Sequence, residues 1–351
     1  MPTPARLTIN DVARAAGVSR GTVSNVFSHP ERVRPELRER VETVARDIGY
    51  GGPDPRGRLL RRGKFGAVGY VVPGAYGFVN LIESPFGREM LLGVADACDA
   101  AGISLTLIDG RAAQIEAAVD NALVDGLIIG TAGSAPVIER AMRRGMRVAI
   151  VDVAADAAIS SVSIDAVTGA KLAARHLLDL GHRRFAIVSV RRTQGEPIDH
   201  APGRRTTTLR DGGPLDREKL RGYSEALTAA GLDINAMPVL ETVPWQADIG
   251  PALFAAAPDA TAILVMSDRQ AMTILRDFAR LGRRVPEQAS IVGFDGVPDG
   301  AAALPPLTTI EQPTREKARR ATELALSAGP AQHSMLSVKL LVRASSGPAP
   351  A

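Results

Sequence analysis

The sequence predicts an α/β protein in which a small all-α unit at the N-terminus precedes a larger body built on parallel sheets. Two observations support this prediction. Near the N-terminus, two short helical patterns flank Gly17, and a third helical pattern follows them. After Lys64, short apolar runs alternate with amphipathic stretches, which is typical of parallel strands covered by helices. At 351 residues, the chain is long enough for two or three folding units.

The first helix is expected to begin next to Thr8, because Thr8 and Asp11 form the Thr-x-x-Asp pattern of a capping box. Gly17 can adopt the left-handed conformation that ends this helix and turns the chain sharply. Ser19 then caps a second helix. These signals predict two short helices joined by a tight turn.

A third helix is expected to start at Pro35 and to run to Gly49. Arg34, which precedes it, lacks the short polar side chain that caps a helix best. Three helices with a tight turn between the first two form a helix-turn-helix, whose second helix enters the DNA major groove. A plain three-helix bundle without a DNA-binding role fits the helix spacing equally well.

Net charge favours the DNA-binding alternative. Residues 1–64 hold 13 Lys and Arg against 7 Asp and Glu, whereas residues 65–351 hold 29 against 31. A basic N-terminal unit on a near-neutral body is the distribution expected of a module that binds phosphates.

Residues 7–27, LTINDVARAAGVSRGTVSNVF, and residues 33–50, VRPELRERVETVARDIGY, resemble the head of lactose-repressor-type (LacI/GalR) transcription regulators. The resemblance continues across nearly all of the chain. It implies a repressor that binds a palindromic double-stranded DNA operator as a homodimer and responds to a small-molecule effector. It also implies base-reading positions at Arg20, Gly21 and Asn25, and phosphate contacts at Thr8, Ser19, Thr22 and Ser24.

Two of these positions depart from the family pattern. Gly21 has no side chain that reaches a base edge, and Asn25 stands where many members carry arginine or histidine. We therefore expect an operator half-site that differs from the common one.

A basic segment at residues 51–65 separates the predicted head, residues 1–50, from the body. The resemblance implies a hinge helix that forms on the operator and lies in the minor groove. There, Leu60 from two subunits would wedge open a base step while Arg58 and its neighbours grip phosphate. A plain basic linker is the alternative.

The body is expected to contain one α/β unit twice. Residues 88–102 and 217–231 share Arg-Glu-x-Leu-x-Gly and a terminal Ala-Ala-Gly, and two later segments end at Asp152 and Asp295. Two similar lobes leave a cleft at the carboxyl ends of their strands, where open α/β sheets bind ligands. The resemblance implies the same architecture, a periplasmic-binding-protein-like core.

We expect this two-lobed core to span residues 66–346. Its predicted first lobe covers about residues 66–158 and 313–330, and its second covers about 159–312 and 331–346. The last residues, SSGPAPA, are expected to be disordered and to provide no tetramerisation helix.

The resemblance implies an effector site in the cleft, with candidates carried over position by position. Asp268 and Trp245 are the main ones, because a carboxylate accepts paired hydroxyl bonds and an indole packs on a sugar ring. A carbohydrate effector is therefore expected. Asp295 fits a structural role equally well. The candidates are Phe86, Asp165, Lys219, Trp245, Asp268, Asp295 and Gln312.

Two features put the effector class in question. Lys219 stands where the family generally places arginine, and lysine lacks the planar fork of a guanidinium. Residues 191–215 form a longer and more basic segment than the usual short loop. This segment is expected to close over the cleft or to admit an anionic effector, and a surface loop without a function is the alternative.

Enzyme and membrane functions are not expected. The histidines lack metal-ligand spacing, and no nucleophile elbow, phosphate loop or dinucleotide fingerprint is present, so we expect no cofactor and no metal. No apolar run approaches the roughly 18 residues of a membrane span. The start of the chain lacks the apolar core of a secretion signal, and the single cysteine, Cys98, fits a cytoplasmic protein associated with the nucleoid when bound to DNA. A secreted solute-binding protein would share the body, but it would not need the basic head.

Overall fold

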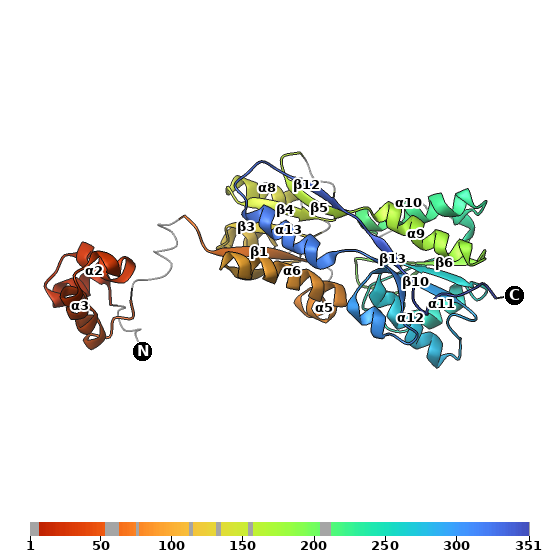
Figure 1. Ribbon diagram of the computed structural model, residues 1–351, viewed down its shortest axis with the longest axis horizontal. Helices are drawn as coiled ribbons and strands as arrows, with labels where there is room; N and C mark the ends of the chain where they lie inside the picture. Colours follow the sequence, from red (N-terminus) through yellow and green to blue (C-terminus); the bar gives the residue numbers. More distant parts are fainter. Residues whose placement is uncertain are drawn as a thin grey trace. The chain divides into compact units, whose positions relative to one another are not determined.

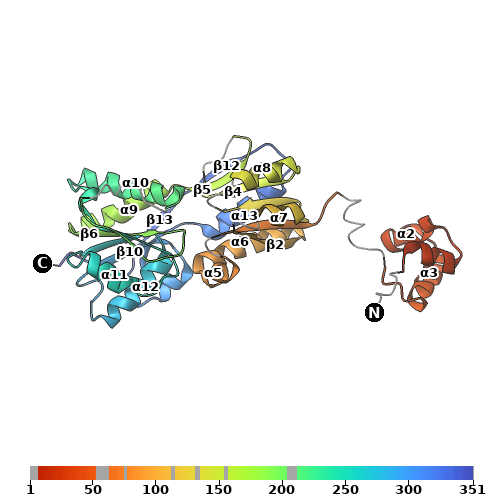
Figure 2. The ribbon, with the colours of Figure 1, turned by 180° about the vertical axis from the view of Figure 1, so that it is seen from behind.

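The computed structural model describes residues 7–52, 63–74, 77–111, 115–130, 135–153, 157–203 and 212–350. The chain forms two compact units, which divide between Phe65 and Gly66 (Figures 1 and 2). Among the described residues, no helix is both long enough and apolar enough to cross a membrane.

The described part of the N-terminal unit is a small helical bundle. Its elements are α1 (Ile9–Ala16), α2 (Arg20–Ser28), the 3₁₀ turn η1 (Pro30–Arg32) and α3 (Pro35–Asp47). Val12, Val23 and Val41, one from each α-helix, are fully buried against one another. The bundle therefore has a core of its own, and the predicted helix-turn-helix is confirmed.

The ends of these helices follow the predicted signals. The backbone N–H of Thr8 donates to Asp11 Oδ2 over 2.9 Å, which completes the capping box. Gly17 ends α1 in the left-handed conformation with φ of 62°. Ser19 Oγ caps α2 by accepting the N–H of Thr22 over 3.0 Å. The side chain of Arg34 makes no capping hydrogen bond to α3, as the sequence predicted.

The first lobe of the larger unit is built on a parallel sheet. Its described strands lie in the order β12-β5-β4-β3-β1-β2. Helices α6 (Pro85–Ala101) and α13 (Thr314–Leu326) cover one face, and α7 (Ile115–Asn121) and α8 (Ala135–Arg143) cover the other. Helix α5 (Gly77–Glu83) precedes α6. The strands are β1 (Ala67–Pro73), β2 (Ser104–Gly110), β3 (Gly126–Ile129), β4 (Arg147–Val151), β5 (Ser160–Ile164) and β12 (His333–Leu336).

The second lobe repeats this arrangement. Its described strands lie in the order β13-β11-β10-β9-β6-β8-β7, with antiparallel strands at both edges. Helices α9 (Ala166–Asp179) and α10 (Pro214–Ala229) cover one face, and α11 (Ile249–Ala256) and α12 (Asp268–Arg280) cover the other. The remaining elements are β6 (Phe185–Val190), β7 (Ile198–His200), η2 (Ile234–Ala236), β8 (Val239–Thr242), β9 (Ala262–Val265), β10 (Ser290–Asp295), η3 (Pro298–Ala302), β11 (Thr308–Glu311) and β13 (Lys339–Leu341).

The sheet order confirms the predicted internal repeat. The similar segments lie on α6, which connects β1 to β2, and on α10, which connects β6 to β8. In both lobes the strand before the helix lies between the strand after it and the next strand, β3 or β9. Asp152 and Asp295 consequently stand at the carboxyl ends of equivalent strands, β4 and β10.

The boundaries predicted for the lobes need one correction. Residues 159–164 and 331–336 were expected in the second lobe, but β5 pairs with β4 and β12 pairs with β5 in the first sheet. The short connection after β4 keeps β5 beside it, because successive elements with short links usually remain neighbours. In the described chain, the crossings between lobes lie instead at Asp165, at residues 312–313 and at residues 337–338.

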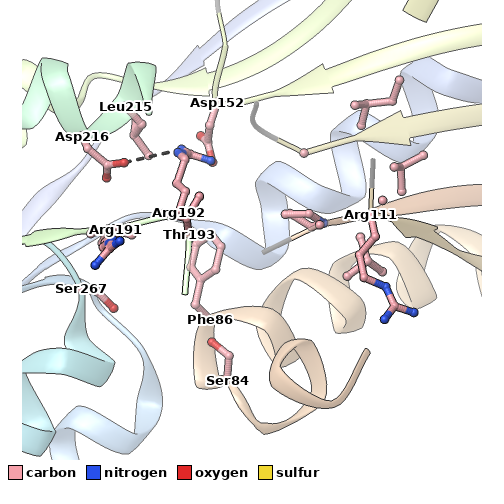
Figure 3. Close-up of a pocket in the computed structure, with 18 of the residues that line it drawn as sticks. Ser84, Phe86, Arg111, Asp152, Arg191, Arg192, Thr193, Leu215, Asp216 and Ser267 are labelled. Carbon is pink, nitrogen blue, oxygen red and sulfur yellow. Dashed lines mark ion pairs between the residues drawn. The ribbon is translucent and has the colours of Figure 1, made fainter. Parts of the chain in front are cut away.

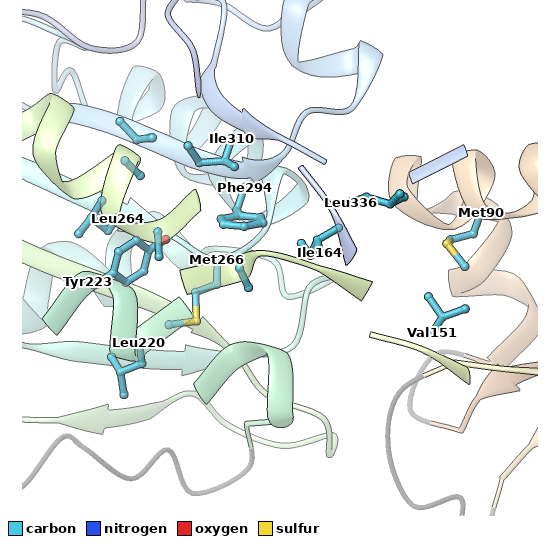
Figure 4. Packing of buried hydrophobic residues seen from close by; sticks show 14 of the residues in the cluster. Met90, Val151, Ile164, Leu220, Tyr223, Leu264, Met266, Phe294, Ile310 and Leu336 are labelled. Carbon is cyan, nitrogen blue, oxygen red and sulfur yellow. The ribbon is translucent and has the colours of Figure 1, made fainter. Parts of the chain in front are cut away.

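A single apolar cluster extends through both lobes (Figure 4). Met90 and Val151 belong to the first lobe, and Tyr223 belongs to the second. Ile164 and Leu336, which immediately precede two of the crossings, lie between these groups. The lobes therefore share packed side chains at the crossings.

The C-terminal segment contradicts the expectation of disorder for the described residues 345–350. Ser345 is fully buried, and its hydroxyl donates to Ile291 O over 2.6 Å. The carbonyl of Gly347 lies 3.1 Å from Nε2 of the buried His182. The composition of this segment suggested disorder, but polar partners in the second lobe supply its hydrogen bonds.

Candidate functional site

The first candidate surface is the exposed side of α2. Val23 and Val26 are buried, whereas Arg20, Gly21 and Asn25 are exposed. Arg20 and Asn25 carry the hydrogen-bonding groups that suit guanine and adenine edges, respectively. This side of the helix is therefore equipped to contact bases in the major groove.

The predicted phosphate-contacting residues lie around the same turn. Thr8 and Ser19 are exposed at the starts of α1 and α2, and Thr22 and Ser24 are half-buried. The hydroxyls of Ser19 and Thr22 lie 2.9 Å apart. Helix starts with exposed hydroxyls are common phosphate contacts. The two remaining DNA-contact candidates, Arg58 and Leu60, lie outside the described residues.

Gly21 has no packing reason to be glycine. A Cβ built on it would meet only Ser19 Oγ, at an ordinary 3.6 Å, and the residue lies inside α2. Gly21 is the second residue of α2, and glycine within a helix costs up to about 1 kcal/mol relative to alanine. Glycine at this position therefore lowers the stability of α2. Because no side chain stands there, the backbone of α2 can come close to a binding partner.

The second candidate site is a cavity of about 790 Å³ between the carboxyl ends of the two sheets (Figure 3). This volume suits a ligand of the size of a sugar or nucleoside. Of the candidates from the sequence, Phe86, Lys219, Asp295 and Gln312 line it. Asp165, Trp245 and Asp268 are not among the described residues that line the cavity.

Asp165 and Trp245 occupy other positions. Asp165 caps α9 by accepting the N–H of Thr168 over 2.9 Å, and the hydrogen bonds from Thr168 lower the pKa of its carboxyl. Trp245 is half-buried in the segment after β8. The expectation that Trp245 packs on a ligand ring in this cavity therefore receives no support from the geometry.

Asp268 fixes the backbone that follows β10. Its Oδ2 accepts the N–H groups of Gly296 over 2.8 Å and Val297 over 3.0 Å. Its Oδ1 accepts the hydroxyl of Thr309 over 2.5 Å. Both oxygens of this fully buried side chain thus accept hydrogen bonds from groups of the protein itself, which is the pattern of a structural residue.

Burial, reinforced by the neighbouring charge of Asp295, raises the pKa of Asp268 to about 7. The folded state therefore retains a proton that the unfolded chain releases near its ordinary pKa of 3.8. The resulting stabilisation is complete below pH 3.8 and is lost as the pH rises through about 7. We expect the contribution of Asp268 to the melting temperature of the core to fall over this range.

Asp268→Asn should flatten this dependence, because an amide does not titrate and can still accept from the two backbone N–H groups. Scanning calorimetry from pH 4 to 8 measures the slope, and Asp259→Asn provides a control at an exposed aspartate. An unchanged slope in Asp268→Asn would exclude Asp268 as its source.

Two aspartates related by the internal repeat line the cavity in strained conformations. Asp152 follows β4 with φ of 60°, and Asp295 ends β10 with φ of 147°. Positive φ is unfavourable for a residue with a side chain and concentrates at ligand sites. The repeat therefore presents one carboxylate from each lobe to the cavity.

A continuous set of buried hydrogen bonds connects these two carboxylates. The Lys317 ammonium contacts both oxygens of Asp152, at 2.6 and 2.8 Å, and donates to Gln312 Oε1 over 2.7 Å. The Gln312 amide then donates to Asp295 Oδ1 over 2.8 Å. Gln312 lies at a crossing, so this network joins the two lobes at that crossing.

Lys317 is a residue that the sequence analysis missed. It is fully buried in α13 and its ammonium lies 5.3 Å from the centre of the Phe86 ring. Its spacing of four residues from Ala321 places it on the apolar face of the helix. A lysine on the apolar face of a helix indicates that a buried acidic side chain pairs with it.

The described beginning of the inserted segment forms part of the cavity wall. Arg191, Arg192, Thr193 and Gln194 all line the cavity, and Arg192 Nη2 lies 3.5 Å from Asp216 Oδ2. The ammonium of the buried Lys219 donates to Met266 O over 2.8 Å. The cavity thus has a basic side, in the second lobe. Among the described residues, no cluster of acids, histidines or cysteines is suited to hold a metal ion.

Both units resemble known proteins. Residues 8–52 match the family described as bacterial regulatory proteins, lacI family, and residues 174–346 match a periplasmic binding protein-like domain. The HTH-type transcriptional regulator Rv3575c of Mycobacterium tuberculosis is 34% identical, covering 93% of this chain and 92% of that protein. The HTH-type transcriptional regulator CelR of Thermobifida fusca is 30% identical, covering 90% of each. A solved structure of a transcriptional regulator CelR-cellobiose complex has a TM-score of 0.67 and 28% identity, covering 97% of this chain and 100% of that chain.

Proposed function

The chain belongs to the lacI family of bacterial regulatory proteins, and we propose that it represses transcription by binding a palindromic operator as a homodimer. The observation that carries this proposal is the exposed polar side of α2, on a bundle that packs and caps as a helix-turn-helix. Such a role belongs in the cytoplasm, on the nucleoid when DNA is bound. It requires no enzymatic activity.

We propose that Arg20 and Asn25 read bases, and that Thr8, Ser19, Thr22 and Ser24 contact phosphates. Gly21 would bring the helix close to the groove. Arg58 and Leu60 complete the proposed set through the family resemblance alone, as a phosphate contact and a minor-groove wedge.

A small metabolite in the cavity would control this binding. The cavity lies between lobes joined by short crossings, so a ligand that prefers one lobe angle would shift the population of angles. The cellobiose bound to the related CelR supports a carbohydrate or a carbohydrate derivative as the effector class. We propose that four candidates identified from the sequence contact the effector, together with Asp152. The four are Phe86, Lys219, Asp295 and Gln312.

Selection of duplexes from a random pool tests the proposal directly. The full-length protein should enrich sequences with two inverted half-sites, and gel-shift or anisotropy titrations should show that small metabolites change the affinity. Non-specific binding should lose affinity steeply with salt, because basic groups that neutralise phosphates release counterions. Enrichment of no palindromic sequence, with or without metabolites, would exclude a LacI-type operator function.

The surface of α5 supports a homodimer. Phe78, Val79 and Ile82 are exposed at 39%, 67% and 54%, on one short helix of the first lobe. Leu92 on α6 adds a fourth exposed apolar side chain. Adjacent exposed apolar residues are typical of an interface, and a two-fold interface would pair this surface with itself.

Ile82→Asp should therefore dissociate the dimer, because a carboxylate in an apolar interface loses its hydration. Sedimentation velocity should show a monomer, and operator affinity should fall at least roughly tenfold, since one head contacts only one half-site. Met142→Asp, on the exposed side of α8, is the control. A dimer that persists in Ile82→Asp would remove α5 from the interface.

A further inference from the structure

The two walls of the cavity differ in chemistry. In Figure 3, Arg111 of the first lobe stands opposite Arg191 and Ser267 of the second. Most of the described lining residues of the second lobe carry charged or hydrogen-bonding side chains. In the first lobe, the ends of β1 and β3 and the starts of α7 and α8 present an apolar wall instead. This apolar wall consists of Val71, Pro73, Ile115, Ile129, Pro136 and Val137.

The apolar wall is continuous with the core of the first lobe. Val71, Ile129 and Val137 belong to the cluster between the sheet and helices α7 and α8, and Ile115 packs against this cluster. The three cluster members are at most 3% exposed, so the surrounding core fixes their positions. A ligand group that binds against a preformed wall orders no loose side chains, which favours its affinity.

The charged side chains of the described first-lobe wall are at its solvent-exposed margin or are paired within the protein. Arg111 Nε donates to Asp109 Oδ2 over 2.7 Å, and the Arg111 side chain is 63% exposed. Glu116 accepts from Arg140 Nη1 over 2.9 Å and is 59% exposed. Asp152 is held by the lysine ammonium described above. A ligand group against the apolar wall therefore contacts hydrocarbon surface.

Gly130, which follows β3, keeps space open beside the apolar wall. It lacks the positive φ that favours glycine. Among the described residues, the nearest atoms to a Cβ built on it would be in the Pro73 ring, at 3.4 Å, and the Tyr70 hydroxyl, at 3.8 Å. Both are ordinary contacts. At Gly110, by contrast, a Cβ would lie 2.0 Å from Val72 O, so backbone packing requires glycine there. Packing does not require it at Gly130, where the missing side chain leaves room for ligand atoms.

We propose that the effector of this regulator is amphipathic, with a carbohydrate body against the second lobe and an alkyl or aryl substituent against the apolar wall of the first. The proposal rests on the effector role assigned to the cavity. The cavity volume of about 790 Å³ has room for both parts of such a molecule. A free monosaccharide would leave the apolar wall uncovered.

Matched glycosides test this assignment on the full-length protein. Methyl, butyl and phenyl glycosides of a panel of hexoses, pentoses and disaccharides are compared by thermal shift and calorimetric titration. The methyl glycoside controls for the blocked anomeric hydroxyl. For at least one sugar, the butyl or phenyl glycoside should bind roughly tenfold or more tightly than the methyl glycoside, because the larger substituent buries more apolar surface.

Two variants alter the apolar wall in different ways. Val137→Thr puts a hydroxyl in place of a methyl group, and Gly130→Ala fills space with one methyl group. Each should lower the affinity for the preferred glycoside by roughly fivefold and leave the affinity for the methyl glycoside nearly unchanged. Val119→Thr, in the same cluster but not among the described lining residues, and Gly329→Ala, at an exposed glycine, should not alter the preference.

Two results overturn the proposal. One is a wild-type protein that binds no butyl or phenyl glycoside of the panel more tightly than the methyl glycoside. The other is a full preference in both Val137→Thr and Gly130→Ala. Because Gly130→Ala adds only ordinary contacts, it remains informative if Val137→Thr fails to fold.

The proposed function is judged separately, by operator selection in the absence of ligand. Enrichment of palindromic duplexes by a protein without any preference for apolar substituents rejects only the amphipathic effector. A preference for apolar substituents without any operator binding rejects the regulatory role and leaves the binding site in place.

Discussion

Lys317→Met is expected to lower the free energy of unfolding of the core by roughly 3–5 kcal/mol, because it leaves Asp152 as a buried carboxylate without its cation. Methionine has nearly the length of lysine and fills the same space against Phe86, so the loss is electrostatic in origin. Urea denaturation followed by circular dichroism measures it as a shift in midpoint at constant slope.

A double variant separates the charge from the packing. Asp152→Asn combined with Lys317→Met removes both charges and should recover much of the lost stability, since replacing both partners of a buried pair is often near neutral. If Lys317→Met unfolds at the same urea concentration as the wild type, the pair does not stabilise the core. If the double variant is as unstable as the single one, the loss comes from packing.

Arg20→Ala should weaken operator binding by roughly tenfold to a hundredfold and relax the base preference at one position of each half-site. Asn25→Ala should do the same at a different position, because the two side chains lie five residues, about 1.4 turns, apart on α2. Selection with each variant identifies the position, and anisotropy titrations on the operator and on random duplex give the affinities.

Arg46→Ala is the matched control for Arg20→Ala. It removes the same charge from the N-terminal unit at an exposed site on α3. It should weaken specific and non-specific binding slightly and alike. Equal losses for Arg20→Ala on operator and random DNA would show that Arg20 contacts phosphates and reads no base.

The features that the sequence predicted best depend on residues that are close together in the chain. The capping box at Thr8, the left-handed Gly17 and the start of α3 at Pro35 depend on neighbours within a few residues. The apolar strands were equally clear, since β1, β3, β9 and β10 are buried along nearly their whole length. The internal repeat then predicted that the body contains two similar lobes.

The missed features depend on partners distant in the sequence. Strands β5 and β12 are short and carry serine, and only their neighbours reveal which sheet they join. Lys317 bonds to Asp152, 165 positions away. The sequence predicts that the Asp268 carboxylate accepts hydrogen bonds from hydroxyl groups of a ligand. In the structure it accepts them from backbone N–H groups in the turn after β10. Such contacts require the three-dimensional fold.

The three crossings between the lobes in the described part of the chain limit how the core can move. Asp165 is a single residue between β5 and α9, and the other two crossings have two residues each. The first lies beside the start of the last, since the Asp165 N–H donates over 3.3 Å to the carbonyl oxygen of Leu336, the residue before that crossing. Parallel tethers of this length prevent one half from translating along the other, so the accessible rigid-body motion is a swing about an axis through them. A ligand bound in the cavity can consequently affect the rest of the core only through the angle between the two lobes.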